Sequence, residues 1–155
     1  MSREKAASQI RFETGQIKTL LRSYATLLEA CSVKTPDLVE MTAAASVLHS
    51  FYNGVENIFR CIAREIDMHS PSGEHWHRDL LVRMAADTLD RDAVISTELR
   101  DRLAEYLGFR HYYRHAYSFS LEWSELSKLV DPLLGVWDQL RSELERFLDA
   151  IEDQT

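Results

Sequence analysis

The sequence predicts an all-α protein, an antiparallel bundle of four to five helices. The chain has 155 residues, 45% of them hydrophobic and 28% charged, which is ordinary for a globular protein with one buried core. Only five glycines and three prolines occur, so few positions can end a helix or form a turn. Apolar residues recur at three- and four-residue steps over long stretches, the period of an amphipathic helix. We therefore expect residues 1–155 to form a single helical domain.

The first half of the chain predicts two long helices. The first covers about Glu4–Cys31, and Pro36 lies in the break that follows it. The second begins near Asp37 and carries an unbroken apolar seam as far as Ile66, as in antiparallel bundles. The segment 69–74 is a loop by composition, because it contains Ser-Pro-Ser-Gly.

Three shorter helices are predicted in the second half. Residues 76–84 form the first of them, and Ser96 is a suitable N-cap for the next. After a connection at residues 118–124, a final apolar seam runs from about residue 126 to residue 151. Pro132 lies inside this seam and lacks a backbone N–H, so we expect a kink or a helix start there.

Charge and cysteine content restrict the class of protein. The net charge of −7 argues against a protein that coats nucleic acid through many phosphate contacts. No apolar run approaches the roughly 18 residues of a membrane span, and no secretory leader opens the chain. Cys31 and Cys61 are isolated, so two reduced core thiols are expected rather than a disulfide scaffold. These features predict a cytoplasmic protein without a membrane contact.

The densest chemistry lies in residues 108–117, which read Gly-Phe-Arg-His-Tyr-Tyr-Arg-His-Ala-Tyr. Its centre is Arg110, followed after four residues by His115 and after one more by Tyr117. A guanidinium can hold a phosphate, an imidazole can move a proton, and a phenol offers a hydroxyl that can be modified. With Arg114, this is the one dense cationic spot of the chain, and any RNA contact is expected here.

Arg110 continues the apolar stripe of its helix, where a charged side chain needs partners. One interpretation is a snorkelling arginine whose head reaches water or a carboxylate on a neighbouring helix. The other is an arginine at the floor of a cleft that binds an anion.

The helical period places Arg110 and His115 on different faces of their helix. On a regular helix, Arg110 and His115 are about 140° apart, whereas His111 and His115 share a face. Arg110 and His115 can therefore act together in two ways. The helix can end near Arg114 so that the next turn brings His115 round, or the site can lie on a two-fold axis where an arginine of one chain meets a histidine of another.

The segment Gly108-Phe109-Arg110-His111-xxx-His115-Ala116-Tyr117, late in a helical chain, resembles the HEPN superfamily. More narrowly, it resembles the HepT-like toxins of HEPN/MNT toxin–antitoxin pairs, whose mark is Arg, four residues, His, one residue, Tyr. Family members often have Asn after the Arg, where this chain has His111. The resemblance covers about residues 99–147.

The resemblance implies a dimeric bundle that acts as a metal-independent endoribonuclease without a cofactor. It implies that Arg110 and His115 are catalytic, with His111 and Arg114 as auxiliary phosphate-binding groups. A nucleotidyltransferase antitoxin is the implied partner, and in characterised pairs it can add AMP to the motif tyrosine, here Tyr117. The alternative for Tyr117 is simple packing along the apolar stripe with its hydroxyl at the surface.

Two other functional classes fit the same residues. The chain can be a non-catalytic helical protein whose basic motif binds a nucleotide or a nucleotidyltransferase, or it can be the antitoxin of its pair. A metal site at His69, His75 and His77 is not expected, because residues two apart point to different sides of a helix and no cysteine is near. Gly54 within the second helix predicts a close helix crossing, with a site role for neighbouring Glu56 or Asn57 as the alternative.

Overall fold

The computed structural model describes residues 2–153 and confirms the all-α bundle. No strand occurs in this part of the chain, only an isolated bridge between Thr88 and Arg91. A 3₁₀ turn at Ser118–Ser120 precedes the last two helices. The α-helices are α1 (Ser2–Ser23), α2 (Ala25–Val33), α3 (Leu38–Glu65), α4 (Trp76–Met84), α5 (Thr97–His115), α6 (Trp123–Val130) and α7 (Leu133–Glu152).

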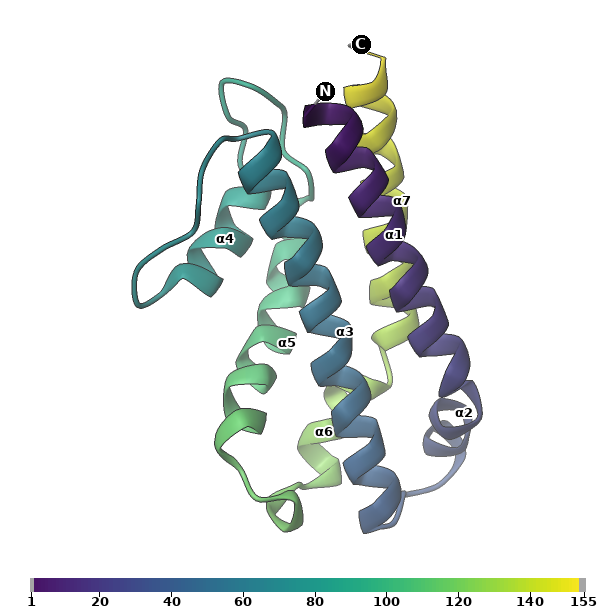
Figure 1. The fold of residues 1–155 in the computed structure, drawn as a ribbon. Coiled ribbons are helices and arrows are strands. Elements are labelled where there is room, and N and C mark those ends of the chain that lie inside the picture. Colours follow the sequence, from purple (N-terminus) through teal and green to yellow (C-terminus); the bar gives the residue numbers. More distant parts are fainter. Residues whose placement is uncertain (1, 154–155) are drawn as a thin grey trace.

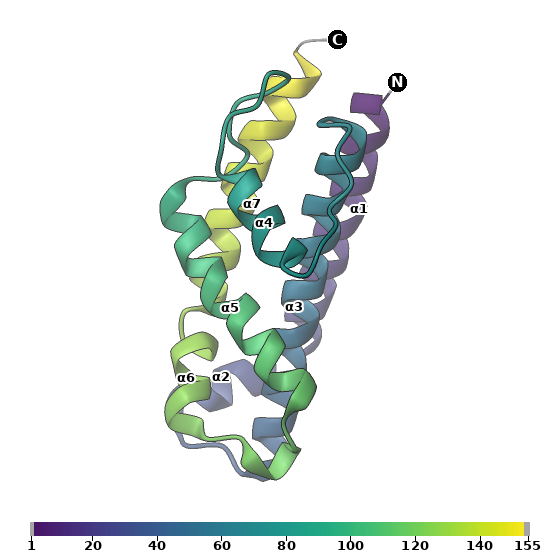
Figure 2. The same ribbon diagram turned by 90° about the vertical axis from the view of Figure 1, so that its left-hand side faces the viewer.

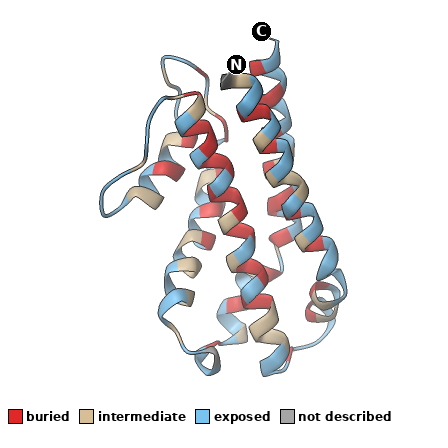
Figure 3. Ribbon diagram, in the orientation of Figure 1, coloured by how far each residue is buried: buried red, intermediate tan, exposed pale blue. Residues whose placement is uncertain are grey.

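Helix α3 is the centre of the bundle and contacts α1, α2, α4, α5 and α6 (Figures 1 and 2). Half of its residues are buried, including Phe51, Val55 and Phe59 with no exposed surface, as the buried colouring of α3 in Figure 3 shows. Helix α7 packs against α1 and α5, and the two chain ends lie at the same end of the bundle (Figure 1). No helix between residues 2 and 153 is long and apolar enough to cross a membrane.

The crossing of α1 and α3 explains the glycine inside α3. A Cβ atom placed on Gly54 would lie 2.8 Å from Cγ1 of Ile17, whose side chain is buried in α1. The absence of a side chain therefore lets the two helices approach closely, as the sequence predicted.

One helix boundary differs from the sequence-based expectation, and another agrees with it. The first predicted helix is interrupted at Tyr24, where α1 ends and α2 begins. The hydroxyl of Ser23 donates to the carbonyl of Thr19 at 2.7 Å, a contact that bends helices and that apolar periodicity does not reveal. Pro132 marks a helix start, because it is the N-cap of α7 after the separate helix α6.

Side-chain caps anchor the helices that carry the candidate site. Asp37 and Glu40 form a capping box at the start of α3. Ser96 caps α5, since its Oγ accepts from the N–H of Leu99 at 3.1 Å, as predicted. The buried carboxylate of Glu143 on α7 accepts from the backbone N–H of Ser96 at 2.6 Å, which ties the start of α5 to α7.

A buried ion-pair network joins the end of α3 to α4 and to the segment before α5. The side chain of Asp67 has no exposed surface and accepts hydrogen bonds from Arg83 at 2.7 Å and from Arg91 at 2.8 Å. Arg91 also donates to the carbonyls of Ala86 and Asp92. Breaking a buried pair of this kind is strongly destabilising, so the network keeps α4 beside α3 and α5.

Candidate functional site

The motif predicted from the sequence lies in the last two turns of α5. The helix continues through His115, and Ala116 leaves it with an extended backbone at φ −96° and ψ 147°. Arg110 and His115 therefore remain on different faces of one regular helix, about 140° apart. The alternative in which α5 ends near Arg114 and turns His115 toward Arg110 is thus wrong.

The guanidinium of Arg110 contacts α3 through an amide. Its Nε donates to Oδ1 of Asn53 at 3.1 Å, and the side chain is half-buried. No carboxylate within residues 2–153 forms an ion pair with Arg110. The carboxylate partner that the snorkelling interpretation allowed is therefore absent among these residues. The amide orients the guanidinium without neutralising it.

The amide of Asn53 also contacts His49, a histidine that sequence reasoning missed. Because Oδ1 of Asn53 accepts from Arg110, its Nδ2 faces Nε2 of His49, at 3.2 Å, and donates to it. This assigns the proton of a neutral ring to Nδ1, which is buried and has no hydrogen-bond partner in the described part of the chain. Burial lowers the pKa of His49, and the charges of Arg110 and Arg114 lower it further.

A cavity of about 750 Å³ lies between α4 and α5, and Arg110 is in its wall. Four arginines line it against two acidic side chains, although the whole chain carries a charge of −7. Arg100 pairs with Asp101 at 3.1 Å, whereas Arg78 and Arg114 have no hydrogen bond or ion pair among the described residues. The cavity therefore favours an anionic ligand. Its charged and histidine lining consists of Glu74, His75, His77, Arg78, Arg100, Asp101, Arg110, His111 and Arg114.

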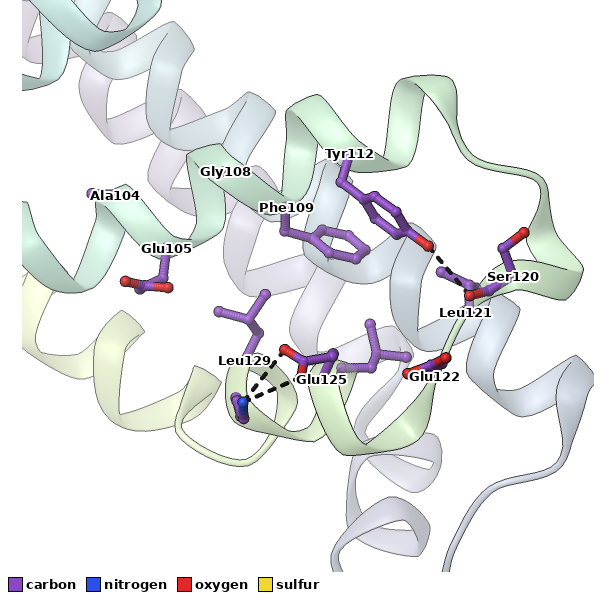
Figure 4. A pocket seen from close by; sticks show the side chains of 12 residues that line it. Ala104, Glu105, Gly108, Phe109, Tyr112, Ser120, Leu121, Glu122, Glu125 and Leu129 are labelled. Atoms are coloured by element: carbon purple, nitrogen blue, oxygen red, sulfur yellow. Dashed lines mark hydrogen bonds and ion pairs between the residues drawn. The ribbon is translucent and has the colours of Figure 1, made fainter.

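A second cavity, of about 490 Å³, lies between α5 and α6 (Figure 4). Its acidic lining residues are Glu105, Glu122 and Glu125, and Lys128 pairs with Glu125 at 3.3 Å. Tyr112 closes one end, because its hydroxyl donates to the carbonyl of Ser120 at 3.2 Å. The excess of carboxylates disfavours a phosphate there, so charge selects the α4–α5 cavity as the candidate anion site.

The other predicted residues divide between this cavity, which Arg114 and His111 line, and the surface outside it. His111 and His115 are exposed on one face of α5, with ring centroids 5.2 Å apart, as their spacing predicted. His111 lines the cavity and His115 does not. Tyr117 lies beyond the helix, 73% exposed, and stacks on Phe119 at a centroid distance of 5.4 Å. It does not pack along the apolar stripe, so its hydroxyl-bearing ring is accessible.

Two further polar groups face this region from outside the motif. Nδ1 of His77 lies 2.7 Å from Oε2 of Glu56, whose side chain is 7% exposed. His77 belongs to α4, within the helix predicted at residues 76–84, and is half-buried. One signal pointed to the α3 residues. His49, Asn53 and Glu56 follow one another at steps of four and three, which places them on one face of the helix.

Comparison with known families agrees with this helical fold. Residues 43–151 match the model of a family described as HepT-like protein. The match begins inside α3 and extends through most of α7, a range that includes Asn53, Arg110 and His115. The chain therefore belongs to the HepT-like proteins of the HEPN superfamily. Neither a curated protein nor a solved structure matches it.

Proposed function

We propose that this HepT-like protein is a metal-independent endoribonuclease toxin whose site combines Arg110 and His115. The observation that carries the proposal is the state of Arg110. Its guanidinium is half-buried, is oriented by the amide of Asn53, has no carboxylate partner within the described residues, and lines a cationic cavity. An arginine held in this way can donate two parallel hydrogen bonds to a phosphodiester.

The chemistry that fits these groups is attack of an RNA 2′-hydroxyl on the adjacent phosphorus. An imidazole takes the hydroxyl proton, the 2′-oxygen bonds to phosphorus, and the bond to the 5′-oxygen of the next nucleotide breaks as that oxygen is protonated. Arg110 stabilises the additional negative charge on the phosphoryl oxygens. The products are a 2′,3′-cyclic phosphate and a free 5′-hydroxyl, and no metal ion takes part.

The position of His115 supports a site shared by two protomers. His115 is exposed on a different face of α5 from Arg110 and lies outside the cavity that Arg110 lines. A two-fold axis beside the end of α5 would place His115 of one protomer against Arg110 of the other, and would do so twice. Of the two arrangements that the sequence left open, this one agrees with a helix that stays regular through residue 115.

Silencing by a nucleotidyltransferase antitoxin fits the exposure of Tyr117. With 73% of its surface exposed, this side chain is accessible to an enzyme that transfers AMP. The added phosphate and nucleoside would bring negative charge and bulk to the end of α5, near Arg114 and His115. Both effects would oppose binding of an RNA phosphate in the α4–α5 cavity.

Cleavage of RNA in the presence of EDTA tests the proposal. The wild-type protein should cut single-stranded RNA to products with 2′,3′-cyclic phosphate ends. Arg110→Ala and His115→Ala should each abolish cutting, with an unchanged helical circular dichroism spectrum. Arg22→Ala, which removes an exposed arginine of α1, should remain active and is the matched control. Full activity of the His115→Ala protein would contradict the mechanism.

A non-catalytic nucleotide-binding protein is the second candidate, and the size of the cavity favours it. About 750 Å³ is within the range of pockets that hold small ligands. This protein would bind AMP or a short oligonucleotide with Arg110-dependent affinity and would leave RNA intact. The same assay therefore separates the two candidates.

A further inference from the structure

Glu56 is a buried carboxylate near the middle of α3, and the proposed cleavage steps leave it unused. Only 5% of the residue is exposed, and a buried carboxylate is costly unless it is paired. Its partner is His77 on α4, with 2.7 Å between Oε2 and Nδ1. Contact with a carboxylate assigns a proton to Nδ1 and leaves Nε2 as the ring atom that can exchange a proton with a ligand.

The ring of His77 is held by a stacking contact on one face as well as by Glu56 at Nδ1. The indole of Trp76 stacks on it at a centroid distance of 3.7 Å, and the guanidinium of Arg60 lies 5.3 Å from the centre of the indole. The side chain of His77 keeps 26% of its surface exposed. A carboxylate that orients an imidazole while one ring nitrogen stays accessible is the arrangement of carboxylate–histidine pairs in acid–base catalysis.

His77 and Arg110 line the same cavity, from α4 and from α5 respectively. A phosphate bound by Arg110 there would share its cavity with an oriented imidazole of the same chain. His115 lies outside this cavity within one protomer. Two histidines, His77 on α4 and His115 on α5 of the other protomer, would thus approach one phosphate from different helices.

We propose that His77 is a further catalytic residue, the proton donor to the leaving 5′-oxygen, and that Glu56 is its positioning residue. This inference rests on the proposed ribonuclease function. In the step, His115 takes the proton of the 2′-hydroxyl as the 2′-oxygen bonds to phosphorus. The bond from phosphorus to the 5′-oxygen breaks, and that oxygen takes the proton from Nε2 of His77. Glu56 stabilises the doubly protonated ring before transfer, and proton exchange with water restores both histidines.

A substrate with a sulfur in place of the bridging 5′-oxygen tests this assignment. A thiol has a pKa of about 8.5, so a thiolate leaves without a proton donor, whereas an alkoxide does not. On ordinary RNA, His77→Gln should lower kcat about 100-fold, the usual contribution of a positioned acid. On the sulfur substrate, His77→Gln should cleave at nearly the wild-type rate.

The variants chosen for comparison separate proton donation from a structural role of the Glu56–His77 pair. Glu56→Gln keeps an acceptor for Nδ1 but loses the charge, so it should also be impaired on ordinary RNA and rescued by sulfur. His115→Ala lacks the base and should be impaired on both substrates. His69→Gln, at an exposed position in the α3–α4 connection, should behave as wild type. A structural defect would reduce the cleavage of both substrates equally.

The outcomes distinguish this inference from the proposed function. Equal impairment of His77→Gln on both substrates, or full activity on ordinary RNA, would overturn the role of His77. If Arg110→Ala and His115→Ala were inactive in the same experiment, the proposed ribonuclease function would stand without a role for His77. A wild-type protein that cleaves neither substrate would overturn both proposals. Rescue of His77→Gln by sulfur, with His115→Ala still inactive, would support both.

Discussion

Arg110 donates a hydrogen bond from Nε to Oδ1 of Asn53 at 3.1 Å, and this contact joins α5 to α3 at the candidate site. It orients the guanidinium by a neutral group, so the charge remains available to a ligand. A carboxylate at position 53 would orient Arg110 equally well but would compete with an anion.

Replacement of Asn53 should therefore weaken anion binding in a graded way. Asn53→Ala removes one oriented hydrogen bond and should reduce affinity for a 2′-O-methyl oligonucleotide about tenfold. Asn53→Asp is nearly isosteric and adds a negative charge beside Arg110, so its loss of affinity should be larger. Fluorescence anisotropy at fixed salt measures both. Equal affinity of the Asp variant and the wild-type protein would show that Arg110 does not contact the ligand.

The lowered pKa of His49 predicts that the protein becomes less stable as the pH falls. Burial, Arg110 and Arg114 lower the pKa from 6.5, so the unfolded chain binds a proton more readily than the folded one. The contribution of His49 is present above the unfolded value and is lost as pH falls toward the lower folded value. Urea unfolding at a neutral and an acidic pH should therefore show a smaller loss for His49→Gln than for wild type. An unchanged loss, matching that of His69→Gln, would contradict this assignment.

The close approach of α1 and α3 predicts opposite effects of two glycine substitutions. Gly54→Ala places a Cβ atom 2.8 Å from Cγ1 of buried Ile17 and should lower the free energy of unfolding by about 1–2 kcal/mol, despite the better helix propensity of alanine. Gly15→Ala in α1 meets no atom within 4 Å and should raise it by up to about 1 kcal/mol. Thermal or urea unfolding measures both. Stabilisation by Gly54→Ala would mean that the crossing is not tight.

Exposure of Tyr117 predicts where a nucleotidyltransferase partner would act. After co-expression with such an enzyme, intact-mass analysis should show a gain equal to one AMP, and Tyr117→Phe should abolish it. Tyr112→Phe is the control, since Tyr112 is also exposed but its hydroxyl is engaged by the carbonyl of Ser120. A mass gain that persists in Tyr117→Phe would remove this residue from the proposed regulation.

Most helices could be predicted from the sequence, because caps and apolar periodicity are local features. Ser96 caps α5 as expected, α3 begins next to Asp37 as expected, and Pro132 begins α7. The break at Tyr24 escaped prediction, because it accompanies a hydroxyl–carbonyl contact of Ser23 that no hydrophobic period encodes.

The candidate site was only partly predictable for a different reason. Spacing within α5 separated the faces of Arg110 and His115, since that geometry belongs to one helix. The groups that orient Arg110 and His77 lie on α3, and contacts between helices are not encoded in the spacing along either one. Asn53 therefore emerges only when α3 and α5 are packed together, and Glu56, which the sequence offered only as an alternative site residue, gains its partner His77 only when α3 and α4 are packed.

The central claim is a site built from Arg110 of one protomer and His115 of another. Mixing two variants that each lack one of these side chains tests this claim most directly. Arg110→Ala and His115→Ala proteins should each be inactive alone, but a mixed dimer would retain one site in which both residues are intact. After subunit exchange at equal concentrations, about a quarter of the wild-type RNA cleavage should return, because half of the dimers are mixed and each has one intact site. No recovery in a mixture shown to contain mixed dimers would contradict the shared site.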